Sequence, residues 1–338
     1  MLDDGAPTRK ATLATMPSMI HPRILRTLNL EAAPGAARPR HLSAGSGLVV
    51  VDDFIYVVAD DELHLGCFRR SSDAAGSLVR LFPGDLPGEH AERKAAKPDL
   101  EALVRLPAFA TYLHGVLLAV PSGSTPQRCR GALLRLDASG ASIGNPESID
   151  FSPLFAGLSA QVPALNIEGS VLVDDALILL HRGSRMYPLS ALIELSLPDV
   201  LAGLATRSAI ETLSPRCVRW VDLGAIGGVA LSITDGAALP DGRLVVAAVA
   251  EQSTDSYADG PCLGAVIGVL DRDGRVLQLH HLQPTYKIEG VQAWMDDGRI
   301  RMLMVTDADA EDTPSFLLEA ELSATAQASA KADWLSPT

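Results

Sequence analysis

Five segments of this chain begin in the same way: a short apolar run, a turn, and at once a second apolar run of strand length. The first runs read SGLVVV, LEALVRL, IEGSVLV, TDGAALP and IEGVQAWM, and the runs that follow them read FIYVVA, GVLLAV, ALILLH, RLVVAAVAE and RIRMLMVT. They recur about 55 to 67 residues apart, which is the sequence signature of a repeat architecture. Repeats of this size built only of short strands are typical of the four-stranded blades of a β-propeller.

Turn residues divide each repeat into strands. The fourth repeat is the clearest, because Asp241-Gly242 and Asp273-Gly274 each separate two apolar runs, as in β-hairpins. The fifth repeat has only three candidate strands before the chain loses its pattern. We therefore predict that residues 23–30, RILRTLNL, supply the missing fourth strand, because a closed ring removes exposed sheet edges.

The sequence thus predicts an all-β protein, a five-bladed β-propeller closed by an N-terminal strand. Residues 21–322 form its single domain, between a flexible N-terminal tail of residues 1–20 and a C-terminal tail of residues 323–338. The segment PDVLAGLATR, between two strands of the third repeat, is interpreted as a short helix. A pair of β-sandwiches or an irregular all-β enzyme is the alternative architecture.

Charge excludes some classes of partner. The net charge is −13 and the isoelectric point is about 5.0, whereas nucleic acids and anionic membranes require a basic surface. No run of 18 apolar residues occurs, and the N-terminus has no apolar export signal. The cysteines are far apart and lack the spacing of metal ligands, which favours reduced thiols in a cytoplasmic protein; they are Cys67, Cys129, Cys217 and Cys262.

Each repeat has a polar residue near the start of its first strand. In a propeller the first strands line the central channel, so residues at equivalent places form a ring at one mouth. The predicted ring consists of Ser46, Glu101, Glu168, Asp235 and Glu289. Four carboxylates in a narrow channel repel one another, and either protonation or a hard divalent cation can compensate them. Calcium is favoured over zinc because no His or Cys recurs in the ring.

Other polar residues are expected beside the ring. Lys97, Asn166 and Lys287 precede ring positions, and Arg182 follows the second strand of its repeat. The end of the second strand lies beside the start of the first, so the polar residues that follow the second strands are expected to border the same mouth. They are Asp60, Asp61, Glu62, Ser122, Gly123, Ser124, His181, Arg182, Gly183, Arg185, Glu251, Asp307 and Asp309. Positive charge beside buried acids is a marker of a binding site. Ordinary salt bridges around the mouth are the alternative interpretation.

The segments NIEG, KIEG and PDLEAL resemble signatures at blade starts in bacterial propeller proteins related to the esterase-like domain of phytases. The resemblance covers most of residues 41–322 and implies acidic residues at the axis and calcium-supported hydrolysis of an ester or phosphoester. Glu101, Glu168 and Glu289 match the acidic member of the signature, while Asp235 is a shortened version. The family's Asp-x-Glu-Gly form occurs here only as Asp99-Leu100-Glu101-Ala102, which departs from it at the glycine.

Three functions follow as hypotheses. The first is a metal-dependent hydrolase, in which Ca²⁺ bound by the ring polarises a small anionic ester or phosphoester. In it Lys97, Arg182, Lys287 and Asn166 bind the substrate, and Glu101, Glu168 or Glu289 activates water. The second is a binding module without turnover, and the third is a scaffold with a structural axial ion. No nucleophile with an adjacent base is evident, which favours water activation over covalent catalysis.

Overall fold

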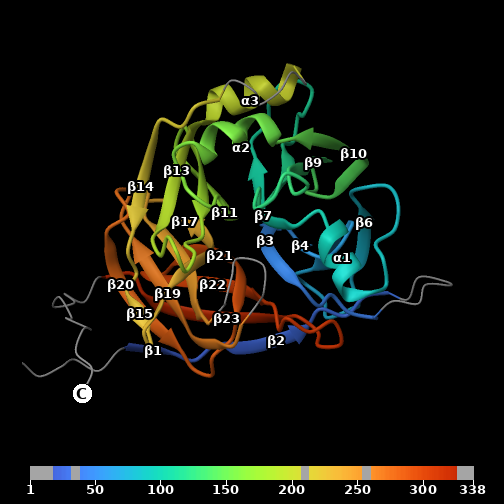
Figure 1. Cartoon of the computed structure of the whole chain (residues 1–338). Helices are drawn as coiled ribbons and strands as arrows, with labels where there is room; N and C mark the ends of the chain where they lie inside the picture. The colour runs from blue at the N-terminus through green and yellow to red at the C-terminus, as the bar shows by residue number, and fades with distance from the viewer. Residues whose placement is uncertain (1–17, 32–38, 207–212, 253–259, 326–338) are drawn as a thin grey trace, which may run out of the picture.

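The computed structural model describes residues 18–31, 39–206, 213–252 and 260–325. Five antiparallel sheets are arranged around a central axis, which confirms the predicted five-bladed β-propeller (Figure 1). Blade 1 consists of β3 (Gly45–Val51), β4 (Phe54–Ala59), β5 (His64–Arg69) and β6 (Ser77–Arg80), in that order from the axis outward.

The next three blades repeat this order. Blade 2 consists of β7 (Leu100–Leu106), β8 (Val116–Pro121), β9 (Arg130–Leu136) and β10 (Ser142–Asp150). Blade 3 consists of β11 (Ile167–Val173), β12 (Ala176–His181), β13 (Ser190–Ser196) and β14 (Cys217–Val221). Blade 4 consists of β17 (Ser232–Ala238), β18 (Leu244–Glu251), β19 (Cys262–Leu270) and β20 (Val276–Leu282), and β1 (Ser18–Ile20) adds a fifth, parallel strand at its outer edge.

Blade 5 closes the ring as predicted. It consists of β21 (Ile288–Asp296), β22 (Arg299–Thr306), β23 (Phe316–Ser323) and, from the other end of the chain, β2 (Arg23–Thr27), which pairs antiparallel with β23. The chain then passes to blade 1, where Leu30 bridges Gly76. Leu28 is fully buried there, in a cluster shared by blades 1 and 5, so the N-terminal segment joins the two ends of the ring through both hydrogen bonds and packing.

The predicted tails are only partly within the described residues. Residues 18–20, which the sequence analysis assigned to the N-terminal tail, form β1 and pair with the outer strand of blade 4. Residues 1–17 and 326–338 lie outside the described part of the chain, so their assignment as tails stays a prediction. No helix within the described residues has the length and apolarity needed to cross a membrane.

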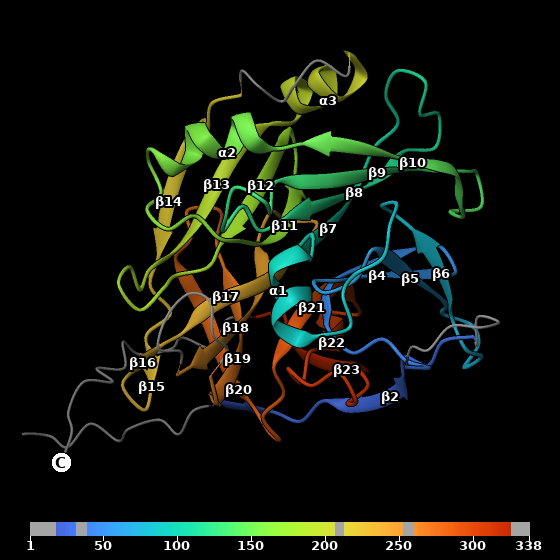
Figure 2. The same ribbon diagram turned by 45° about the vertical axis from the view of Figure 1, so that its right-hand side comes forward.

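Within the described residues, three helices and a small hairpin accompany the blades. The predicted helix of the third repeat is α3 (Leu197–Thr206), while α1 (His90–Ala96) and α2 (Ser152–Ser159) were not predicted. Figure 2 shows α1 in front of the inner strands, over one mouth of the channel. The hairpin formed by β15 (Ala225–Ile226) and β16 (Val229–Ala230) precedes β17. All four cysteines are free thiols.

The inner strands approach one another very closely. A Cβ atom at Gly290 would lie 3.0 Å from the backbone nitrogen of Leu48, and a Cβ atom at Gly47 would lie 3.0 Å from that of Leu103. Contacts this short leave no room for a side chain at Gly47 or Gly290, where adjacent inner strands meet. This spacing determines which side chains can point into the channel mouth.

Candidate functional site at the channel mouth

A β-bulge turns one residue of each inner strand out of the ladder. The pairing of the first and second strands skips one residue near the start of the inner strand in all five blades. A bulge of this kind re-aims a side chain without ending the sheet. The skipped residues are Ser46, Glu101, Glu168, Thr234 and Glu289.

The register corrects the predicted ring in blade 4. Thr234 is the skipped residue there, and Asp235 takes the place that Gly47, Gly169 and Gly290 have in their blades. The Asp235 carboxylate accepts a hydrogen bond of 2.8 Å from the backbone N–H of Val291. It therefore fills the space between neighbouring inner strands and does not line the cavity, unlike the other four predicted ring residues.

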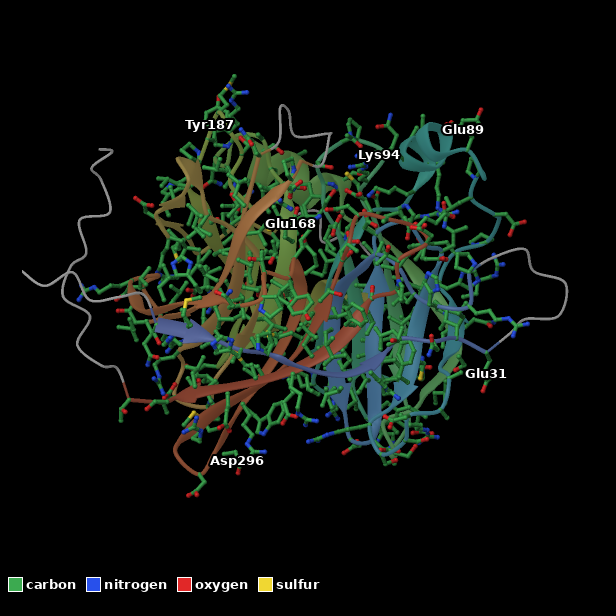
Figure 3. All side chains as sticks on the ribbon, turned by 90° about the horizontal axis from the view of Figure 1, so that it is seen from below. Glu31, Glu89, Lys94, Glu168, Tyr187 and Asp296 are labelled. Carbon is green, nitrogen blue, oxygen red and sulfur yellow. The ribbon has the colours of Figure 1, made fainter. Side chains whose placement is uncertain are left out.

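Those four residues line a cavity of about 530 Å³ at the mouth of the channel. Its wall also includes the ends of the second strands and the last turn of α1, with Lys94 and the adjoining Lys97. In Figure 3, Lys94 and Tyr187 project from the face of the mouth, Glu168 lies inward between them, and Asp296 lies at the opposite end of the molecule. The volume is in the range of small-molecule sites.

Lys97 is the centre of the first charged cluster. Its ammonium contacts the carboxylate of Asp60 from blade 1 and lies 2.9 Å from that of Asp99, which directly precedes blade 2. Asp99 has a left-handed backbone (φ 59°) and also binds the Arg128 guanidinium at 2.9 Å. Burial by itself lowers the pKa of Lys97, but Asp60, Asp99 and Glu101 together raise it above its usual value. Lys97 therefore stays charged and ties blade 1 to blade 2.

Arg182 is the centre of the second cluster. Its guanidinium lies 3.2 Å from the carboxylate of Glu168 in blade 3 and 2.5 Å from that of Glu251 in blade 4. The side-chain amide of Asn166 donates a second hydrogen bond, of 2.5 Å, to Glu168. Burial nevertheless raises the pKa of Glu168 to about 8, since the attraction of Arg182 is opposed by the charge of Glu289.

Lys287 is the centre of the third cluster, between blades 4 and 5. Its ammonium lies 2.5 Å from Asp309, 3.4 Å from Glu289, 3.8 Å from Asp307 and 4.0 Å from Glu251. Burial raises the pKa of Glu289 and that of Asp307, and Lys287 counteracts the shift in both. One cation thus serves four carboxylates, so the region holds excess negative charge or bound protons.

These contacts show which cations compensate the negative charge of the ring acids. The three cations that the sequence analysis expected beside the ring, Lys97, Arg182 and Lys287, are each paired with carboxylates at the mouth. Of the residues predicted to follow the second strands, eight line the cavity: Asp60, Ser124, Arg182, Gly183, Arg185, Glu251, Asp307 and Asp309. The prediction is wrong for Asp61, Glu62, Ser122, Gly123 and His181, which do not line it. Arg128 and the hairpin residues Val229 and Ala230 were missed, because they come from segments without a repeated pattern.

Several solved structures are similar to the chain. They include glutaminyl cyclase from Myxococcus xanthus (13% identity, TM-score 0.46, covering 90% of this chain and 99% of that one). An α-L-arabinanase mutant from Cellvibrio cellulosa has 12% identity and a TM-score of 0.42, covering 82% and 91% of the two chains. A gluconolactonase from Xanthomonas campestris has 11% identity and a TM-score of 0.35, covering 91% and 99%.

Comparison with curated proteins finds no match. A protein-family model does match, over residues 41–322, which is nearly the whole ring of blades. The chain therefore belongs to a family of unknown function, DUF6929.

Proposed function

We propose that the chain is a hydrolase-like propeller that acts on a small anionic ester or phosphoester in the cavity at the channel mouth. The observation that carries this proposal is the cluster of Glu168, Arg182 and Glu251, in which a cation and two buried carboxyl groups line one side of a cavity of ligand size. Such sites combine anion binding with proton transfer.

Glu168 is the best candidate for the proton transfer. With a pKa of about 8 it holds a proton at neutral pH and can release it near working pH, as an efficient general acid or base requires. Its protonated carboxyl would donate to the leaving oxygen, and its ionised form would accept a proton from the attacking water. Asn166 positions it through the hydrogen bond to one carboxyl oxygen.

Arg182, Lys97 and Lys287 would hold the anionic group of the substrate. Each is paired with carboxylates, but burial raises the pKa of several of these acids, Glu101 among them. Protonation of such acids lowers the negative charge around the buried cations and so favours the binding of an anion in the cavity. Glu101 and Glu289 are further candidates for catalytic residues, as the resemblance to esterase-like propellers also implies.

Calcium fits the charged clusters poorly. The candidate group of ligands is Asp60, Asp99 and Glu101, whose oxygens lie within 4.8 Å of one another. The Lys97 ammonium contacts both aspartates and lies between them, where the ion would have to bind. A divalent cation would therefore compete with a buried, charged lysine. The proposed hydrolysis accordingly does not use a metal ion.

A binding module without turnover is the second candidate. The observation in its favour is that the three central cations are saturated by carboxylates, an arrangement that makes the site rigid without leaving an evident nucleophile. Turnover of a substrate decides between the two functions.

The test is a screen of esters, phosphoesters and lactones with and without chelator, on the wild type and two variants. We expect hydrolysis that resists chelation and that falls at least about a hundredfold in Glu168→Gln. Glu194→Gln is the matched control, because Glu194 also pairs with an arginine, Arg219 at 2.7 Å, but lies on β13 away from the cavity. Ligand binding without turnover of any compound would favour the binding module.

A further inference from the structure

Blade 4 departs from the others at two positions, one at its bulge and one on its second strand. At its bulge it has Thr234, which is fully buried and donates a hydrogen bond of 2.5 Å to the backbone oxygen of Ile288. On its second strand it has Val249, which pairs with Ser232 and lines the cavity. The equivalent residues of the other blades are all polar: Asp60, Ser122, Arg182 and Asp307.

The segments beside blade 4 extend this apolar wall. Pro188, Val229 and Ala230 line the cavity from the loop after β12 and from the hairpin β15–β16. The Ser232 hydroxyl donates a hydrogen bond of 3.3 Å to the backbone oxygen of Gly183, which fixes the loop to blade 4. The mouth therefore has a charged side, formed mainly by the other blades, and a more apolar side over blade 4, which Arg185, Ser232 and Gln252 also line.

The apolar side continues out of the cavity. Met186 is 79% exposed on the same loop, next to Tyr187 and Leu189, which are 42% and 39% exposed. Tyr187 projects from the face that carries the mouth, as Figure 3 shows. Large apolar side chains exposed together beside a polar cavity indicate a contact for the apolar part of a ligand.

We propose that the substrate is an amphiphile, a small ester of a straight-chain carboxylic acid with an anionic alcohol part, whose alkyl chain lies along Pro188, Val229 and Val249 while its ester group faces Arg182. This inference rests on the proposed hydrolase function and names its substrate class. In the reaction, the oxygen of water forms a bond to the acyl carbon, the bond to the alcohol oxygen breaks, and that oxygen takes the proton of Glu168. One proton of the attacking water passes to the Glu168 carboxylate, which is thereby protonated again. The products are the alcohol and the straight-chain carboxylic acid.

The carboxylate products serve as probes, so the test does not depend on turnover. Binding of acetate, butyrate and hexanoate to the full-length protein is measured by calorimetry and by ligand-observed NMR. Each methylene placed on the apolar wall should tighten binding about fourfold, so butyrate should bind about 15-fold more tightly than acetate. Equal affinities for the three acids, or no binding of any of them, would overturn the inference.

Two variants test whether the alkyl chain of the ligand lies along the apolar side of the cavity. Val229→Asp should weaken hexanoate binding at least about tenfold and leave acetate nearly unchanged. Val276→Asp is the control, because Val276 is partly buried against the same apolar cluster but lies on the outer strand β20. Val249→Thr keeps the shape of the side chain and should also reduce the dependence of binding affinity on the chain length of the carboxylate. This second variant tests the inference if Val229→Asp does not fold.

The outcomes separate the two proposals. Chain-length-dependent binding without hydrolysis of the corresponding esters would contradict the hydrolase and leave the apolar subsite standing. Hydrolysis that shows no preference for chain length, or a preference that both variants retain, would overturn the subsite and leave the hydrolase standing.

Discussion

Replacing Glu168 with Gln should change how the stability of the protein depends on pH. A carboxyl group whose pKa is higher in the folded than in the unfolded state binds protons more tightly when folded. Its contribution to stability is therefore present at low pH and is lost as the pH rises from the unfolded value through the folded one. For Glu168 that window runs from the usual glutamate pKa of 4.5 to about 8.

The size of the effect follows from the two pKa values. Between pH 5 and pH 7 the wild type should lose about 2 to 3 kcal/mol of unfolding free energy through Glu168. A neutral Gln cannot titrate, so Glu168→Gln should lack this loss. With a urea slope of about 3 kcal/mol/M, the difference is a relative shift of about 0.8 M in the unfolding midpoint.

Urea unfolding at pH 5 and pH 7 measures this shift for the wild type, Glu168→Gln and the control Glu194→Gln. The hydrogen bond from Arg219 lowers the pKa of Glu194, so its contribution is lost only below pH 5 and the control should parallel the wild type. If Glu168→Gln also parallels the wild type, Glu168 is ionised throughout and is only an ion-pair partner of Arg182. The proposed proton transfer would then lose its basis.

Three further predictions concern ring geometry and charge. Gly290→Ala should destabilise the protein by about 1 to 3 kcal/mol in urea unfolding, because its Cβ would approach the backbone of Leu48, whereas Gly88→Ala has open space and should be neutral. Leu28→Ala should cost about 2 to 5 kcal/mol by the same measurement, since it leaves a cavity where the ring closes. Calcium should hardly change the melting temperature of the wild type but should raise that of Lys97→Met. The expected stabilisation of Lys97→Met is about 2.7 kcal/mol at a hundredfold excess of calcium over Kd. A large shift in the wild type would contradict the role of Lys97 as the compensating cation.

The blades were predictable because their signals are local. Paired apolar runs separated by turns such as Asp241-Gly242 specify a hairpin wherever they occur. Closure of the ring by residues 23–30 was predictable by elimination. These residues formed a strand without a partner in the first repeat, and the fifth repeat had only three candidate strands. The helix α1 was not predicted because its segment HAERKAA is short and polar and has no apolar face.

The ring was harder to predict because a bulge depends on cross-strand pairing. Asp235-Gly236 resembles Glu168-Gly169 in sequence, and nothing local shows that the skipped residue in blade 4 is Thr234. A shift of one position moves a side chain from the cavity to the space between strands. The cations beside the acids were predictable, but their partners in the next blade were not, since those distances depend on how the blades pack.

Blades 1 and 4 have no acid at the bulge, but in each an acid at another position supplies a carboxylate to the mouth. In blade 1, Ser46 accepts a hydrogen bond of 3.2 Å from the backbone N–H of Asp60, and Asp60 supplies the carboxylate. In blade 4, Glu251 at the end of the second strand supplies it in place of Thr234. Both substitute acids bind a cation that also contacts the neighbouring blade, Lys97 or Arg182. Loss of either cation would leave buried carboxylates unpaired across a blade boundary, so the stability of the ring and the electrostatics of the site depend on the same residues.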